Sequence, residues 1–184
     1  MKRTGTFTLT FIAICIALNF IGANIALFLR LPIYLDTIGS LLASIVLGPW
    51  LGILTAILSA LLSWATTDIF ALFFSPVALL LVLLVGYFIR GNEPLKTLWW
   101  KVIPISLAGT ILSSIITVVL FHGITSSGSS IFVQVLHGLG LNMVTASVLV
   151  QAVTDYVDRL VSLLIVLLCL KRIPLPAFQS GKAN

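Results

Sequence analysis

Charged residues are scarce in this chain of 184 residues, where Asp, Glu, Lys and Arg together make up 8% of the sequence. Roughly a quarter of the residues of a soluble domain are charged, so the low fraction excludes a water-soluble globular protein. Hydrophobic residues make up 60%, and the mean hydropathy is +1.23. A chain of this length has room for about six membrane spans of roughly 20 residues each. The composition therefore predicts an all-α integral membrane protein with one domain, residues 1–184.

Cysteine and histidine are also rare, with two of each. Cys15 and Cys169 lie inside apolar runs near opposite ends of the chain, where small buried thiols are common, so a disulfide is not expected. His137 has no cysteine or carboxylate at the spacing that metal ligands require. We therefore expect no metal and no cofactor.

Catalytic and nucleic-acid-binding signatures are absent from the sequence. It has no Ser-His-Asp order, glycine-rich phosphate loop, His-Glu-x-x-His motif or pair of catalytic carboxylates. The net charge is +5, but the basic residues stand singly or in pairs beside apolar segments. Nucleic acid requires basic residues clustered on a solvated face. The sequence thus predicts neither an enzyme nor a nucleic-acid partner, and membrane lipid is the partner that its surface requires.

Six apolar segments are present, and the predicted spans are residues 6–29, 37–47, 50–64, 76–88, 103–121 and 143–170, with a long Ser/Gly-rich outer loop over 122–142. The first run exceeds the 7–15 residues or so of a cleavable signal sequence, so we expect it to be retained. The second span has about eleven residues, which is short for a hydrocarbon core of ~30 Å. A short span beside a polar loop is typical of the border of a site. Gly48-Pro49 cannot continue a helix and ends this span.

The distribution of basic residues predicts the orientation, because Lys and Arg gather in the cytoplasmic loops of membrane proteins. With six spans and a cytoplasmic N-terminus, only Arg30 and Arg159 fall on the outer side. Both termini are then cytoplasmic, and residues 30–36, 65–74 and 122–142 form three outer loops. The cytoplasmic basic residues of this arrangement are Lys2, Arg3, Arg90, Lys96, Lys101, Lys171, Arg172 and Lys182.

The outer loops and the start of the last span carry most of the polar side chains that are candidates for a binding site. Ionisable groups at membrane depth tend to face an interior cavity or each other, so Asp155 is the best single candidate. The alternative for Asp155 is an ion pair with Arg159 at helical spacing. The predicted substrate-binding residues are Tyr34, Asp36, Thr37, Trp64, Thr67, Asp68, His137, Asn142, Gln151 and Asp155.

Two of these candidates have alternative roles. Trp64 stands immediately before Thr67-Asp68, and an indole beside a carboxylate could hold a flat heteroaromatic ring by stacking and hydrogen bonding. Tryptophan at the end of a span is also a common interfacial anchor. His137 could bind ligand, or it could simply be partly solvated near the bilayer surface.

Small residues form two notches on the predicted spans. Ala13 and Ala17 stand four residues apart on one face of the first span, where they would let another helix approach closely. This notch could dock a partner or could pack against a neighbour within the same chain. In the third span, Gly52, Ala56 and Ala60 continue a stripe that begins at Gly48.

Four motifs follow one another along the chain: Ala13-x-x-x-Ala17, Leu31-Pro32 through Gly39, Leu47-Gly48-Pro49-Trp50-Leu51-Gly52, and Asp155-x-x-Asp158-Arg159 before a last span that ends at Lys171-Arg172-Ile173-Pro174. In their order and spacing, and with the six predicted spans, they resemble the S components of energy-coupling factor (ECF) transporters, the small six-span vitamin-binding subunits of bacterial importers. The resemblance implies that Ala13 and Ala17 dock on a transmembrane coupling (T) subunit, which is bound to two cytoplasmic ATPases. It also implies a site near the outer side of the bacterial cell membrane, capped by the loop between the first two spans, and transport by toppling of the whole subunit.

The small number of cations in the outer loops also restricts the class of substrate that we expect. With only Arg30 and Arg159 as outer cations, a phosphorylated ligand is not expected, and a small neutral or weakly basic ring fits better. Among the vitamins of the family, a hydroxymethylpyrimidine or pyridoxine-like ring suits the site, while riboflavin, thiamine and other vitamins stay open. The alternative function is a self-contained secondary transporter, but such proteins usually show internal repeats and acids near the midplane, which this sequence lacks.

Overall fold

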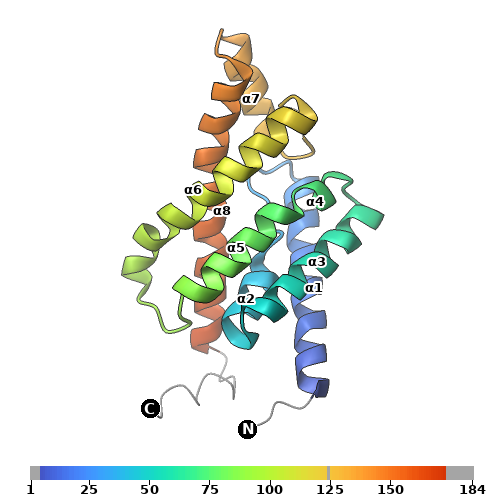
Figure 1. The fold of residues 1–184 in the computed structure, drawn as a ribbon, viewed down its shortest axis with the longest axis vertical. Coiled ribbons are helices and arrows are strands. Elements are labelled where there is room, and N and C mark those ends of the chain that lie inside the picture. The colour runs from blue at the N-terminus through green and yellow to red at the C-terminus, as the bar shows by residue number, and fades with distance from the viewer. Residues whose placement is uncertain (1–4, 124, 173–184) are drawn as a thin grey trace.

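The computed structural model describes residues 5–123 and 125–172 and is all-helical over that range (Figure 1). Three helices, α1, α3 and α6, are long and apolar enough to cross a membrane, and α2 and α5 are shorter apolar helices. The predicted all-α class is thus confirmed, while the count of six spans stays a prediction. The helices are α1 (Gly5–Phe28), α2 (Ile38–Leu47), α3 (Pro49–Thr66), α4 (Phe70–Phe73), α5 (Ser75–Phe88), α6 (Leu95–Phe121), α7 (Ser129–Gly138) and α8 (Met143–Arg172).

The connections between helices alternate between two ends of the molecule (Figure 1). The start of α1, the α2–α3 turn, the α5–α6 connection and the end of α8 lie at the lower end. The α1–α2 connection and α7 lie toward the upper end. The lower end therefore carries Arg90, Lys96, Lys171 and Arg172. Its cytoplasmic orientation stays a prediction, and the termini themselves, residues 1–4 and 173–184, lie outside the described residues.

Three predicted segments differ from the structure. The segment 65–74, predicted as an outer loop, contains the end of α3 and the one-turn helix α4. Helix α6 begins at Leu95 rather than near residue 103, because Pro94 precedes it and Pro104 is accommodated inside it. The segment 122–142, predicted as a loop, contains helix α7. Helix α7 forms because its apolar residues recur at helical spacing, which lets Val133 pack against Ala146 and Val150 of α8.

The turn between α2 and α3 has the geometry that Gly48-Pro49 predicts. Gly48 has φ 101°, a value that L side chains rarely adopt, and Pro49 is the first residue of α3. A Cβ atom on Gly52 would lie 2.7 Å from the Cβ of Ser44 and 2.8 Å from Val82. The small stripe of the third span therefore serves close packing of α3 against α2 and α5 within the chain.

Asn19 joins the first three helices through its buried side chain. Its Nδ2 donates to Ser40 Oγ at 2.6 Å and to Ser59 Oγ at 2.9 Å, and its Oδ1 accepts from the backbone N of Gly39 at 2.6 Å. A buried amide costs free energy unless it is hydrogen-bonded. These bonds satisfy Asn19 and fix α2 against α1 and α3, next to the site described below.

We expect the substitution Gly39→Ala to lower the thermal stability of the purified protein in detergent. A Cβ on Gly39 would overlap the backbone carbonyl of Cys15, so α1 and α2 must separate and the bonds of Asn19 must stretch. Overpacking of this kind costs about 1–3 kcal/mol. The matched control is Gly5→Ala, because a Cβ on Gly5 meets no atom within 4 Å. Equal melting temperatures for the two variants would contradict the close contact of α1 and α2.

Candidate functional site

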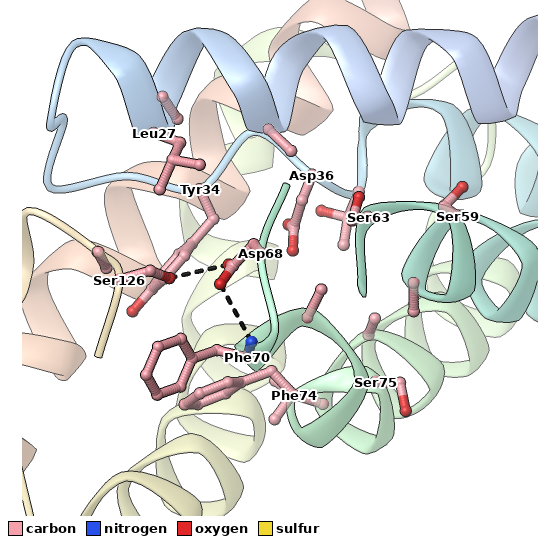
Figure 2. Close-up of a pocket in the computed structure, with 18 of the residues that line it drawn as sticks. Leu27, Tyr34, Asp36, Ser59, Ser63, Asp68, Phe70, Phe74, Ser75 and Ser126 are labelled. Carbon is pink, nitrogen blue, oxygen red and sulfur yellow. Dashed lines mark hydrogen bonds between the residues drawn. The ribbon is translucent and has the colours of Figure 1, made fainter. Parts of the chain in front are cut away.

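A cavity of about 100 Å³ lies among α1, α2, α3, α5 and the α1–α2 connection (Figure 2). This is several times the volume that one water molecule needs. Side chains of α8 and of the connection between α6 and α7 complete its wall. Six of the predicted substrate-binding residues line it, namely Tyr34, Asp36, Thr37, Thr67, Asp68 and Asp155. Two of the three predicted outer loops, 30–36 and 65–74, thus meet at one cavity together with residues 125–127 of the third.

The α1–α2 connection is irregular backbone held against helices. It leads into helix α2, which has only 10 residues, or about 15 Å at 1.5 Å per residue. Leu35 has φ 52°, an unusual value for a branched side chain. Asp158 of α8 stabilises it, because Asp158 Oδ1 accepts from the backbone N of Tyr34 at 2.9 Å and of Leu35 at 2.8 Å.

Close contacts with two glycines hold the same connection. A Cβ on Gly22 of α1 would overlap the backbone carbonyl of Leu35, and a Cβ on Gly128 would overlap that of Arg30. The α1–α2 connection is therefore a packed part of the cavity wall.

Arg159 extends the network from α8 to the start of α2. Its Nη1 lies 2.9 Å from Asp158 Oδ2 and donates to Thr37 Oγ1 at 2.6 Å. Arg159 lines the cavity, and its buried Nε has no hydrogen-bond partner among the described residues. An unpaired buried donor costs free energy, so Nε is a candidate contact for a bound acceptor.

Asp155 accepts hydrogen bonds from two side chains of α6. Its Oδ2 accepts from Thr110 Oγ1 at 3.1 Å and from Ser113 Oγ at 2.9 Å. Arg159 forms its ion pair with Asp158. The alternative in which Arg159 pairs with Asp155 is therefore not observed among the described residues. Asp155 keeps its place in the cavity wall.

Asp36 is a carboxylate of the cavity wall that differs from Asp155 in its hydrogen bonding. It follows Tyr34 in the α1–α2 connection and lies beside the cavity (Figure 2). Its Oδ1 is buried and has no hydrogen-bond partner within the described structure. Burial raises the pKa of Asp36 to about 6, although the positive charge of Arg159 opposes the shift.

The raised pKa of Asp36 predicts a pH effect on the ligand-free protein. A carboxyl group with a folded-state pKa above its unfolded value favours folding when it is protonated. The stabilisation should therefore be full below about pH 4 and should be lost as the pH rises through about 6. We expect the melting temperature of the wild type relative to Asp36→Asn to rise as the pH is lowered from 7 to 5. A difference that does not change with pH would contradict the burial of Asp36.

Asp68 is already satisfied by the protein, unlike Asp36. Its Oδ2 accepts from Ser126 Oγ at 2.8 Å and its Oδ1 accepts from the backbone N of Phe70 at 3.1 Å (Figure 2). These bonds position α4 and the 125–127 segment beside each other. Asp68 therefore shapes the cavity, and a ligand that contacts it must share or replace these bonds.

Several residues that line the cavity were not predicted from the sequence. Phe70 and Phe74 supply the aromatic wall of the cavity, and Phe121 packs on both, with ring centroids 4.7 Å and 6.1 Å away. Ser59 and Ser63 of α3 also line the cavity. Their four-residue spacing with Thr67 marks one face of a helix, a signal that could have identified them.

Four predicted residues lie outside the cavity. Trp64 is 46% exposed because it is rotated away from the face of α3 that carries Ser63 and Thr67. Gln151 is buried against α6, where its Oε1 accepts from Ser114 Oγ and its Nε2 donates to Thr117 Oγ1, each at 2.6 Å.

The other two belong to α7 and its connection to α8. His137 is exposed on α7, with Nδ1 2.9 Å from the carbonyl O of Leu141. Asn142 accepts from the backbone N of Val144 at 2.9 Å and so caps the start of α8. Both side chains therefore have local structural partners away from the cavity.

Ala13 and Ala17 both lie exposed on α1, while Cys15 and Asn19 of the same helix are buried. The notch therefore does not pack against another described helix of this chain, which was the alternative role. The notch stands on an apolar surface that also carries Ile14 and Leu18. A face of this kind is open to another helix.

The sequence was compared with models of protein families, with curated proteins and with solved structures. The model of the family described as the substrate-specific component of ECF transporters matches residues 7–170. The chain belongs to this family. No curated protein and no solved structure matches it.

Membership in the ECF substrate-specific component family makes this chain the substrate-specific subunit of a multi-subunit transporter and a membrane protein. The resemblance recognised in the sequence is thus confirmed. The family is one of transporter subunits rather than enzymes, which agrees with the absence of catalytic motifs. The apolar helices α1, α3 and α6 agree with the membrane assignment.

Proposed function

We propose that this S component binds a small, neutral or weakly basic, water-soluble ring compound, a vitamin or vitamin precursor, in the cavity at Asp36. The observation that carries the proposal is the buried Oδ1 of Asp36, which lacks a hydrogen-bond partner in the described structure and borders the cavity. A buried acceptor without a partner costs free energy. A ligand N–H or O–H group would remove that cost.

The walls of the cavity favour one kind of ligand. Phe70 and Phe74 offer aromatic surface for a flat ring. Asp36 offers an acceptor and Arg159 Nε a donor, while Ser59 and Ser63 offer hydroxyl groups. A hydroxymethylpyrimidine or pyridoxine-like ring carries both donors and acceptors. The single cavity cation, Arg159, is neutralised by Asp158, which argues against a phosphorylated ligand.

Delivery of the ligand would require the partner subunits of the family. We propose that the notch at Ala13 and Ala17 docks on a transmembrane coupling subunit bound to two ATPases, and that the S component topples in the bacterial cell membrane to release its ligand. The apolar exterior of α1 supports such a movement. With both termini cytoplasmic, the cavity would open toward the outer side.

Calorimetric titration of the purified chain with a vitamin panel tests the proposal without the ATPases. We expect saturable binding of one ring compound, and we expect Asp36→Ala to weaken it by about 1–3 kcal/mol, because the ligand donor then lacks its partner. The matched control is Glu93→Gln, which removes a carboxylate from the α5–α6 connection. Folded protein that binds no member of the panel would contradict the proposed function. Equal weakening by both variants would contradict the assigned site.

A further inference from the structure

A second hollow lies between α5 and α6, away from the ligand cavity. It has a volume of about 380 Å³ and is lined by Leu84, Phe88, Lys101, Pro104, Ile105 and Ala108. We call it the α5–α6 groove. Five of these six residues are apolar, and Lys101 is the only charged one. The groove thus joins a hydrocarbon surface to a cation.

The groove is open at the surface of the molecule. Phe88 is 65% exposed, and Pro104 is also exposed. The lower halves of α5 and α6 stand on the opposite side of Figure 1 from α1, the helix with the exposed notch at Ala13 and Ala17. A partner docked on that notch would leave the α5–α6 groove free for lipid.

Positive charge gathers at the lower end of this groove. Lys101 donates to Glu93 Oε1 at 2.7 Å, and Arg90 and Lys96 are exposed nearby in the chain. The hydrogen bond from Lys101 lowers the pKa of Glu93, so this carboxyl group is ionised at neutral pH. Residues 90–101, the segment that enters the groove at Lys101, thus carry three cations against one carboxylate.

Aromatic residues mark the same end as a membrane interface. Trp99 and Trp100 stack with ring centroids 4.1 Å apart, and both are exposed. Tyr87 is exposed beside Phe88 at the end of α5. Trp and Tyr are enriched at the level of lipid headgroups. The cations therefore lie at headgroup depth, and Pro104 and Ala108 lie above them along α6.

We propose that the α5–α6 groove binds an anionic phospholipid, with an acyl chain against Leu84, Pro104 and Ala108 and the headgroup phosphate beside Arg90, Lys96 and Lys101. The charges are complementary, because the headgroup phosphate is negative and the residues around it are mostly basic. A zwitterionic lipid fits the apolar groove equally well but gains less from the net positive charge. Each Lys or Arg near a membrane surface attracts anionic lipid by about fivefold in affinity.

Native mass spectrometry of the purified chain in detergent tests this proposal. The chain is incubated with phosphatidylglycerol or phosphatidylcholine of the same acyl composition, and the retained lipid is counted. We expect a preference of roughly 25-fold for phosphatidylglycerol, from about fivefold for each of two net charges. The double variant Arg90→Gln/Lys96→Gln should bring that ratio close to one. Excess inorganic phosphate should not displace the lipid, because it cannot fill the apolar groove.

A second variant separates the groove from general adhesion of lipid. Ala108→Phe should reduce retention of phosphatidylglycerol severalfold by filling the groove. Leu107→Phe is the matched control, because Leu107 is exposed on α6 but does not line the groove. Equal retention of both lipids by the wild type would overturn the proposal, and so would equal retention of phosphatidylglycerol by the two phenylalanine variants. The surface variants Arg90→Gln and Lys96→Gln keep the test decisive if Ala108→Phe fails to fold.

Discussion

The substitution Ala17→Trp should abolish uptake by the assembled transporter while leaving ligand binding to the isolated subunit unchanged. Ala17 is exposed on α1, and the buried face of the same helix carries Cys15 and Asn19. An indole at position 17 would fill the notch and keep another helix from approaching closely. It would not reach the cavity, because Ala17 does not line it. We expect Ala13→Trp to act in the same way.

Co-purification of the partner subunits and calorimetry on the isolated subunit measure the two effects separately. The matched control is Ala65→Trp, an exposed alanine of α3 that does not line the cavity. It should bind partners and ligand as the wild type does. If Ala17→Trp loses ligand binding but still forms the complex, the notch is not the docking surface.

The substitution Asp158→Ala is expected to destabilise the protein by about 3–5 kcal/mol, because it leaves the charge of Arg159 buried without its partner. Asp158 is completely buried. It also accepts from the backbone N–H groups of Tyr34 and Leu35, so its loss frees the connection that carries Asp36. Ligand affinity should therefore fall together with the melting temperature in detergent.

Two further variants separate the charge of Asp158 from its hydrogen bonds. Asp158→Asn keeps an oxygen that can accept from the backbone of Tyr34 and Leu35, so it should be less destabilising than Asp158→Ala. The double variant Asp158→Ala/Arg159→Leu should be more stable than Asp158→Ala, because it removes the unpaired charge. If the single variant Asp158→Ala melts like the wild type, the ion pair does not hold the α1–α2 connection.

Prediction from sequence succeeded for features that follow from composition and local chemistry. Low charge and long apolar runs predicted an all-helical membrane protein, and Gly48-Pro49 predicted the turn at that position. Helix α7 was not predicted, because the serine and glycine residues before it are typical of a loop. Its stability comes from contacts with α8, which a local pattern does not reveal.

The predicted residues that lie next to polar connections line the cavity, whereas predictions that depended on the orientation of a helix did not hold. Asp36 and Asp68 line the cavity as expected. Trp64 does not, because a rotation of about 100° per residue separates it from Ser63 on the same helix. Arg159 was considered as an outer cation and as a partner for Asp155, but its position in the cavity wall was not predicted. Its contact with Thr37 joins residues that lie 122 positions apart.

The sequence of this S component was by itself enough to predict that it is a membrane protein, that it is all-helical and to which family it belongs. Hydropathy and short motifs are local properties of the chain, so they can be read without the fold. Only the tertiary structure decided which carboxylates of the cavity have hydrogen-bond partners within the described residues. Asp68 finds partners in Ser126 and Phe70, Asp155 finds them in Thr110 and Ser113, and Asp158 holds Arg159 and the α1–α2 connection. The buried oxygen Oδ1 of Asp36 has none among the described residues. Whether a buried polar group is satisfied depends on distant segments that meet only in the folded protein.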